Sequence, residues 1–159
     1  MARDTEGGKL VLVVTTGTCA CGLPLPSVIE TFRPLPIEPV PGPLAFVRGV
    51  SILRGIPTPV IDLGALLGNS AGQATRFVTL RVGDRQAAIS VGAVRGVREI
   101  DSPTLRNLPP LLHGTSNDMI DAIGTLDERV LMVLRDSWQL PEEVWHGLQD
   151  TGKEKKPCP

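Results

Sequence analysis

Glycine and proline interrupt this chain at short intervals along its whole length, and this limits the fold more than any other feature. The 159 residues include 17 glycines and 15 prolines, well above the usual shares of about 7 % and 5 %. Glycine loosens the backbone and proline lacks a backbone donor, so neither suits the interior of a long helix. The spacing therefore predicts many short elements, in one domain or in two small subdomains.

Short runs rich in valine, isoleucine, leucine and threonine lie between these breaks, and this composition is typical of β-strands. The runs cover residues 9–16, 19–23, 46–53, 56–63, 76–82, 86–91, 119–126 and 130–134. The breaks at Arg54-Gly55 and at Gly83-Asp84 indicate hairpin turns. Seven to nine short strands with turns every 8–12 residues predict a mainly all-β sandwich or barrel.

Little helix is expected. Short helical turns fit residues 26–31 and 65–67, and Pro141 followed by two acids suits the start of a short helix over 141–150. Prolines alternate with aliphatic residues over 34–43, which predicts an extended edge or covering loop. A polyproline peptide ligand is the alternative interpretation of that segment.

Charge and aromatic content exclude several classes of partner. The formal net charge is −1, aromatic residues make up 3 %, and tyrosine is absent. Such a chain has no overall attraction to nucleic acid or to an anionic membrane, and few rings on which bases could stack. Residues 10–29 carry no charge, but only 10–14 are continuously apolar, so we expect a strand there instead of a membrane span or signal.

No catalytic or metal-binding motif stands out. Cys19 and Cys21 with a third, distant cysteine make a poor disulfide framework, which favours a reduced, cytoplasmic setting. In a strand the first two would pack as small apolar residues, although a zinc site with a distant histidine is an alternative. A phosphate-loop spacing over residues 147–153 is followed by Glu154, where that motif needs Ser or Thr. We therefore expect no metal and no cofactor.

Two charged residues at the ends of apolar runs carry the most information. Arg54 stands at a predicted hairpin corner, and Asp62 precedes a predicted helical turn. The structural interpretation is that arginine fixes the corner and aspartate caps the turn. The functional interpretation presents Arg54 to a partner protein, because arginine is enriched at interface hot spots. A further alternative is an enzyme or ligand-binding barrel with a pocket near Arg54, Asp62 and His113.

The segment from Phe46 to Leu63 reads FVRGVSILRGIPTPVIDL. This pattern resembles the CheW-like family of chemotaxis coupling proteins, and the resemblance extends over about residues 9–140. It implies two small five-stranded SH3-like β-barrels packed together, and no catalysis. It also implies a cytoplasmic adaptor that joins chemoreceptor tips to the regulatory domain of a histidine kinase, in arrays at the inner membrane that control motility.

The resemblance implies particular site residues. Val28, Glu30, Gly49, Arg54 and Val94 match positions that line the receptor groove, and Arg106 and Leu111 match a kinase-facing surface. Val28, Val94 and Gly49 also have plain structural interpretations, as core residues and as a strand kink. The sequence departs from the family at Ile52 and Gly92, and this bears on which partners bind. A paralogue that binds the kinase alone is the remaining alternative.

The resemblance also suggests a division of the chain. The expected segments are a flexible start over 1–8, the CheW-like domain over 9–140, a short helix over 141–150 and a disordered tail over 151–159. Within the domain, two intertwined subdomains are expected at roughly 17–80 and at 81–135 plus the N-terminal strand.

Overall fold

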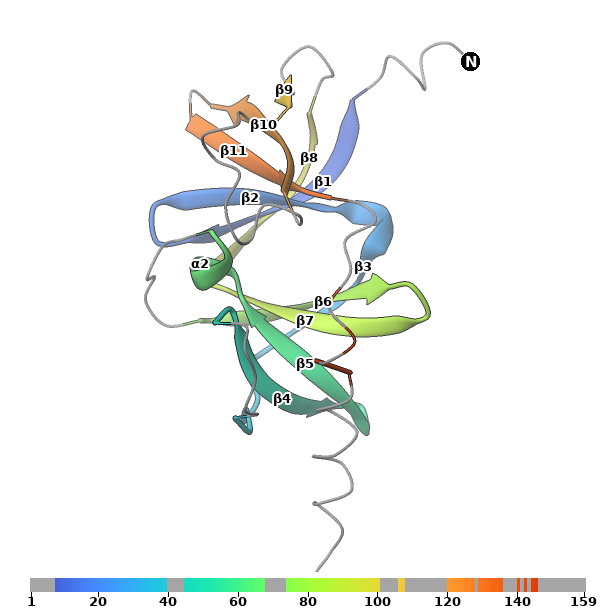
Figure 1. Ribbon diagram of the computed structural model, residues 1–159. Helices are drawn as coiled ribbons and strands as arrows, with labels where there is room; N and C mark the ends of the chain where they lie inside the picture. Colours follow the sequence, from blue (N-terminus) through green and yellow to red (C-terminus); the bar gives the residue numbers. More distant parts are fainter. Residues whose placement is uncertain are drawn as a thin grey trace, which may run out of the picture.

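The computed structural model describes residues 8–39, 45–67, 74–100, 106–107, 120–127, 129–135, 140, 142 and 144–145. This part of the chain consists mainly of β-strands, arranged in two sheets that lie one above the other (Figure 1). The helical elements are a single 3-10 turn, η1 (Leu25–Ser27), and a four-residue helix, α2 (Leu63–Leu66), and the described residues 142, 144 and 145 are also helical. The mainly β fold class predicted from the sequence is confirmed.

The upper sheet has six strands in the order β8-β1-β2-β11-β10-β9. Their bounds are β1 (Lys9–Thr16), β2 (Cys19–Pro24), β8 (Ala93–Ile100), β9 (Arg106–Asn107), β10 (Ile120–Leu126) and β11 (Arg129–Leu134). Neighbouring strands are antiparallel except β2 and β11, which are parallel. Five strands were expected, and the sixth, β9, contains only two residues.

The lower sheet has five strands in the order β3-β6-β7-β5-β4. Their bounds are β3 (Val28–Phe32), β4 (Val47–Leu53), β5 (Ile56–Asp62), β6 (Arg76–Val82) and β7 (Arg85–Val91). The chain leaves the upper sheet after β2 and returns to it at β8. Strand β2 falls within the predicted subdomain 17–80 but belongs to the upper sheet, and β7 falls within 81–135 but belongs to the lower sheet. The subdomain bounds of 17–80 and 81–135 stay a prediction.

Tight two-residue turns join the hairpins at the predicted positions. Leu53 pairs with Ile56, so only Arg54 and Gly55 form the β4–β5 turn. Both have positive φ, 51° and 79°, as in a type I′ turn, whose twist matches that of the flanking strands. Gly83, with φ of 66°, likewise opens the β6–β7 turn.

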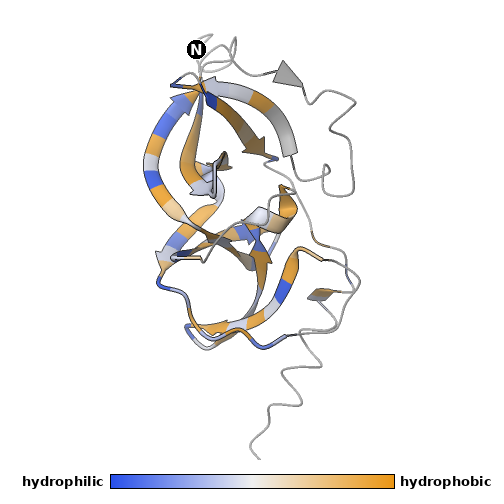
Figure 2. Ribbon diagram, turned by 90° about the vertical axis from the view of Figure 1, so that its left-hand side faces the viewer, coloured by the Kyte–Doolittle hydropathy of each residue, from blue (hydrophilic) through white to orange (hydrophobic). Residues whose placement is uncertain are grey.

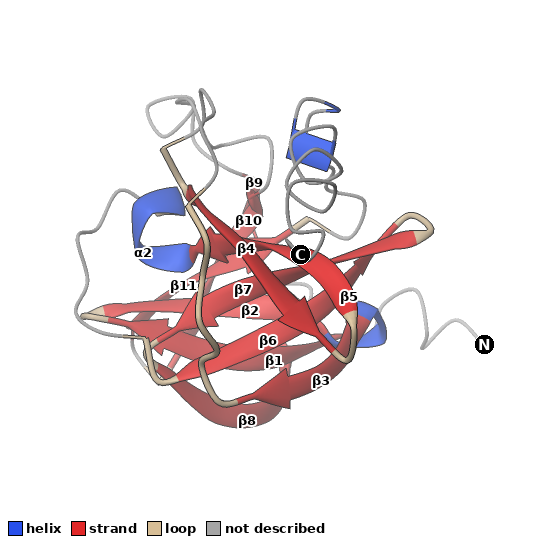
Figure 3. Cartoon of the chain, turned by 90° about the horizontal axis from the view of Figure 1, so that it is seen from below, coloured by secondary structure: helices blue, strands red, loops and turns tan. Residues whose placement is uncertain are grey.

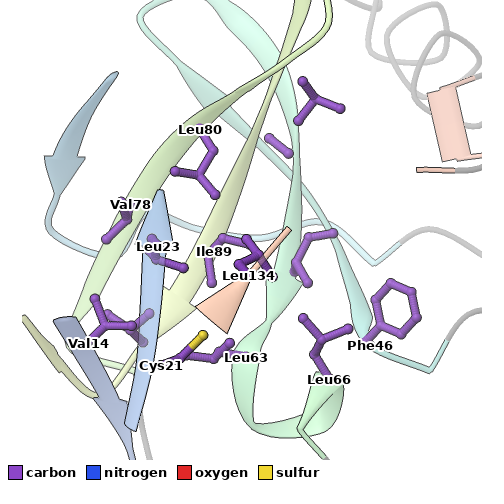
Figure 4. Close-up of a cluster of buried hydrophobic side chains, with 14 of the residues drawn as sticks. Val14, Cys21, Leu23, Phe46, Leu63, Leu66, Val78, Leu80, Ile89 and Leu134 are labelled. Carbon is purple, nitrogen blue, oxygen red and sulfur yellow. The ribbon is translucent and has the colours of Figure 1, made fainter. Parts of the chain in front are cut away.

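The buried side chains form three layers. The largest cluster lies between the sheets and takes residues from both, among them Val14 and Leu23 from the upper sheet and Leu80 and Ile89 from the lower one (Figure 4). A second cluster includes Val11 and Leu131, and a third consists of Leu53, Val60, Phe77 and Ala88. Alternate residues of one strand enter different clusters. Central strands are therefore buried on both faces, as in β1 with its apolar run over 10–14, and hydrophobic segments recur along the strands in Figure 2.

The proline-rich segment covers the outer edge of β4, as expected. Glu38 and Val50 exchange two backbone hydrogen bonds of 2.8 Å each, and the Ser51 hydroxyl donates to the Pro36 carbonyl at 2.6 Å. Ile37 packs against the third cluster. We call residues 34–39 the strap.

One local prediction needs correction, and one open alternative is decided. The helical turn expected over 26–31 ends at Ser27, because the following residues pair with β6 as strand β3. Val94, Val97 and Ile100 recur at intervals of three, which left helix and bulged strand open. The segment is strand β8, and its pairing with β1 shifts by one residue between Val94 and Gly96. The extra residue of the bulge places Val94 and Val97 on one face of β8, whereas Ile100 packs in the second cluster on the other face.

Candidate functional site

The structure places the five expected receptor-binding residues at several points on the two sheets. Val28 and Glu30 belong to β3, Gly49 to β4, Arg54 to the β4–β5 turn and Val94 to β8. Among them, side-chain bonds directly join Glu30 and Arg54 alone, as far as the described residues show. Of the two expected kinase-binding residues, Arg106 lies on β9, and Leu111 is outside the described residues.

Glu30 and Arg54 form a bidentate ion pair. The Arg54 guanidinium donates from Nε to Glu30 Oε2 at 2.7 Å and from Nη2 to Oε1 at 2.9 Å. It also lies 5.6 Å from the centre of the Phe32 ring, within the range of a cation–π contact. Arg54 is therefore held by two neighbouring residues of β3 on one side.

This pair connects the two edges of the five-stranded sheet. β3 and β4 are the outermost strands in the sheet order, yet side chains from β3 and from the end of β4 meet. The sheet must curl for this contact to form, and Figure 3 shows the tip of the β4–β5 hairpin beside β3. The side-chain pair thus joins two edges between which no strand pairing is recorded in the described residues.

The electrostatics of the pair favour both charged forms. The hydrogen bond from Arg54 lowers the pKa of the Glu30 carboxyl, and the bond to Glu30 raises the pKa of the Arg54 guanidinium. The side chains remain 33 % and 69 % exposed, so water and salt screen the attraction. The pair orients the guanidinium more than it stabilises the fold.

Exposed aliphatic side chains flank Arg54. Ile52 is 41 % exposed and Ile56 is 50 % exposed, and they lie on opposite faces of the hairpin, because Ile56 pairs with Leu53 and Ile52 pairs with Pro57. An oriented arginine between aliphatic groups is the chemistry found at the centre of protein–protein interfaces. We call Glu30, Ile52, Arg54 and Ile56 the hairpin-tip surface. The two isoleucines were not among the site residues expected from the sequence.

The other expected receptor residues contact the protein itself. Val28 and Val94 are partly buried and pack against the central cluster. Gly49 is buried, with φ of 148°, and a Cβ atom there would lie 2.1 Å from the carbonyl oxygen of Glu38. These contacts support the structural interpretation of each residue: two core valines, and a glycine that lets the strap approach β4.

The structure does not bring Arg54 and Asp62 together. They lie at opposite ends of the seven-residue strand β5, which at about 3.3 Å per residue spans roughly 20 Å. The Asp62 carboxylate accepts hydrogen bonds from the amides of Gly64 at 2.9 Å and Ala65 at 3.4 Å, so it caps α2. His113 lies outside the described residues. A single pocket cannot use both Arg54 and Asp62.

The two strand cysteines differ in environment. Cys21 is fully buried in the central cluster, and burial, with a smaller effect of nearby Cys19, raises the pKa of its thiol to about 12. Cys19 is partly exposed. Over the described ranges, no three metal-ligating side chains come together, and no helix is long and apolar enough to cross a membrane.

Comparisons with known proteins agree on one family. Residues 10–140 match the model of the CheW-like domain. The chemotaxis protein CheW of Klebsiella aerogenes is 27 % identical over 137 residues, which cover 84 % of this chain and 82 % of that protein. The protein FrzA of Myxococcus xanthus is 33 % identical over 101 residues, or 62 % of each chain.

A solved structure supports the fold. The crystal structure of the scaffolding protein TtCheW from Thermoanaerobacter tengcongensis superimposes with a TM-score of 0.68. The alignment covers 84 % of this chain and 97 % of that protein, at 22 % sequence identity. At this level of identity the likeness establishes the arrangement of the strands and not the partners.

Proposed function

The chain belongs to the CheW-like domain family, and on this premise we propose that it is a non-catalytic adaptor in chemotaxis-type signalling. In this role it joins the cytoplasmic tip of a chemoreceptor to the regulatory domain of a histidine kinase. Relatives named as chemotaxis proteins and a structure described as a scaffolding protein support this function. We place the adaptor in the cytoplasm, beside receptor arrays at the inner membrane.

The hairpin-tip surface is the proposed receptor contact. The observation that carries this assignment is the fixed Arg54 guanidinium, bonded to Glu30 and flanked by exposed Ile52 and Ile56. The side chains of a receptor helix can cover the exposed isoleucine on its own face of the hairpin while an acceptor on that helix bonds the remaining guanidinium nitrogen. Val28, Gly49 and Val94 act in this proposal by shaping the protein behind the surface.

The proposed kinase contact is at the other sheet. Arg106 on β9 and Leu111 in the following segment are the residues assigned to it, on the family resemblance alone. β9 is an edge strand of the six-stranded sheet, whereas the hairpin tip belongs to the five-stranded sheet. An adaptor with one contact on each sheet can hold both partners at once.

The test is affinity capture of tagged protein from its own cells, with bound proteins identified by mass spectrometry. Three forms are compared: wild type, Arg54→Glu, and the double variant Arg54→Glu with Glu30→Arg. The double variant restores an ion pair in reversed order, so it separates the fold of the turn from the charge shown to a partner. A reversed pair elsewhere, Arg98→Asp with Asp127→Arg, is the matched control, because that pair is also exposed.

We expect wild type and the control to capture a chemoreceptor and a histidine kinase. Both Arg54 variants should lose the receptor and keep the kinase, with unchanged circular dichroism and melting temperature. Recovery of the receptor by the double variant would show that Arg54 acts through the turn and not by contact. Kinase without receptor in the wild-type sample would favour the paralogue that binds the kinase alone, and the absence of both partners would overturn the adaptor role.

A further inference from the structure

A pocket of about 470 Å³ opens beside the turn between β6 and β7, and it shares one residue, Ile56, with the hairpin-tip surface. Its lining residues are Ile29, Ile56, Pro57, Arg81, Gly83, Asp84, Arg85, Gln86 and Trp145. The volume lies within the range of small-molecule sites, which combine apolar walls with a few polar groups. The four apolar side chains form such walls, and the charged and amide groups lie on the two strands of one hairpin.

The pocket is the mouth of the curled five-stranded sheet. On β5, β6 and β7, alternate residues face the third cluster, because side chains of a strand point to opposite faces in turn. These inward-facing residues are, in order toward the pocket, Val60, Thr58 and Ile56 on β5, Phe77, Thr79 and Arg81 on β6, and Ala88 and Gln86 on β7. Toward the pocket, the inner face thus ends in a guanidinium group on β6 and an amide group on β7, beside the apolar Ile56 on β5. Barrel mouths are a preferred place for ligands.

The polar groups behind the mouth are already bonded. Thr58 and Thr79 are almost fully buried. The amide nitrogen of Gln86 donates to the Thr58 hydroxyl at 3.0 Å, and Thr58 donates to the Ile56 carbonyl at 2.9 Å. These bonds fix the Gln86 amide at the inner end of the pocket, with its nitrogen turned toward Thr58.

The two guanidinium groups of the pocket differ. The Arg85 guanidinium carbon lies 4.8 Å from the centre of the Trp145 ring, and its Nη1 lies 3.3 Å from Glu142 Oε2. Both partners of the Arg85 charge therefore belong to the protein itself. Arg81 has no bonded partner among the residues that the structure describes, and neither has Asp84 in the turn. Within the described ranges, a cation and an anion without bonded partners therefore border one pocket with apolar walls.

We propose that this pocket binds a small carboxylic acid that has an apolar body and a hydrogen-bond donor beside the carboxylate. An apolar amino acid or 2-hydroxy acid has this chemistry. Arg81 bonds the carboxylate, Asp84 accepts from the ammonium or hydroxyl group, and the aliphatic body lies against Ile29 and Ile56. Ile56 follows the Arg54-Gly55 turn directly, so an occupied pocket would also contact the hairpin that carries the proposed receptor surface.

Isothermal titration calorimetry of the full chain with leucine tests the site. Two analogues separate the groups: leucinamide lacks the carboxylate, and 4-methylpentanoate lacks the ammonium. Arg81→Gln removes the proposed carboxylate partner. Arg76→Gln is the matched control, because Arg76 is an exposed arginine at the opposite end of the same strand. Melting curves check that each variant folds.

We expect saturable binding of leucine, weakened by about tenfold or more in Arg81→Gln and unchanged in Arg76→Gln, since charge-assisted hydrogen bonds are the strong ones. Both analogues should bind more weakly than leucine. Amide signals of Gly83 and Asp84 in NMR spectra should shift on binding. No saturable heat with leucine, equal loss in both arginine variants, or shifts confined to the other sheet would overturn the proposal.

Discussion

At the scale of single residues, Arg54 occupies a backbone conformation that side chains other than glycine rarely adopt. Its φ of 51° lies in the left-handed region, where a non-glycine residue is strained by about 1 kcal/mol or more. The turn would form more easily with asparagine or glycine there. The bonds to Glu30 and the contact with Phe32 hold the side chain in place despite that strain. This arrangement suits a guanidinium that must be presented in one direction.

The carboxyl pKa of Glu30 provides a direct test of the pair. Because Arg54 lowers this pKa in the folded state, the folded protein binds fewer protons here than the unfolded chain does. The stabilising contribution is therefore present above the unfolded pKa and is lost as pH falls through the folded pKa. NMR titration of the carboxyl should show the pKa rising in Arg54→Gln. Arg98→Gln, which removes a distant arginine, should leave it unchanged, and an equal effect of both variants would contradict the pairing.

Gly49 is expected to be a packing residue of the strap. In Gly49→Ala the new Cβ meets the Glu38 carbonyl at 2.1 Å, so the strap must move and two backbone bonds weaken. We expect a loss of about 2 kcal/mol or more in the free energy of unfolding, measured by urea denaturation. Gly96→Ala is the control, because its φ of 110° is also unfavourable but no atom lies within 4 Å. Equal losses would show that backbone strain alone is responsible.

At the scale of elements, the hairpins were predictable and strand β3 was not. Short apolar runs around Arg54-Gly55 and Gly83-Asp84 indicate their partners locally, because the turn sets the register. β3 was missed because Pro26 fits a helix start, and its pairing with β6 joins residues about fifty positions apart. The Glu30–Arg54 bond was missed for the same reason, since the curl of the sheet brings the two together. Sequence spacing carries little information on such contacts.

Asp62 is an element-scale residue whose role the sequence did indicate. A cap on a helical turn is the structural interpretation of this residue, and its carboxylate accepts hydrogen bonds from the Gly64 and Ala65 amides of α2. Asp62→Ala should lower the free energy of unfolding by about 1 kcal/mol, whereas Asp62→Asn or Asp62→Ser should recover most of it, because each can still cap. Chemical denaturation of the three variants measures this. Equal losses in all three would mean that the negative charge, and not the cap, is what matters.

At the scale of the whole molecule, the core is shared between the sheets. The central cluster takes side chains from β1, β2 and β11 above and from β6 and β7 below (Figure 4). Neither sheet can bury this face without the other. The chain also crosses between them twice, after β2 and before β8. Composition predicted the fold class, but the shared core depends on which faces meet, and a strand buried on both faces does not reveal its partner.

A shared core predicts that the two sheets unfold together. Leu80 lies fully buried in the central cluster, so Leu80→Ala should lower the free energy of unfolding by about 2–5 kcal/mol. Native-state hydrogen exchange measures the protection of backbone amides in both sheets in one experiment. The slowest amides of β1 and of β7 should lose protection by the same amount, because each exchanges through global unfolding. Val97→Ala, at a valine that is 50 % exposed, should change neither.

The opposite result has a clear physical meaning. If Leu80→Ala lowered protection in β7 and left β1 unchanged, the upper sheet would keep its structure while the lower one opened. The second cluster, around Val11 and Leu131, would then suffice to hold the upper sheet. Such independence would let one sheet rearrange without the other. Equal loss instead means that a partner docked on either sheet stabilises both, because any ligand that binds only the folded state shifts the same unfolding equilibrium.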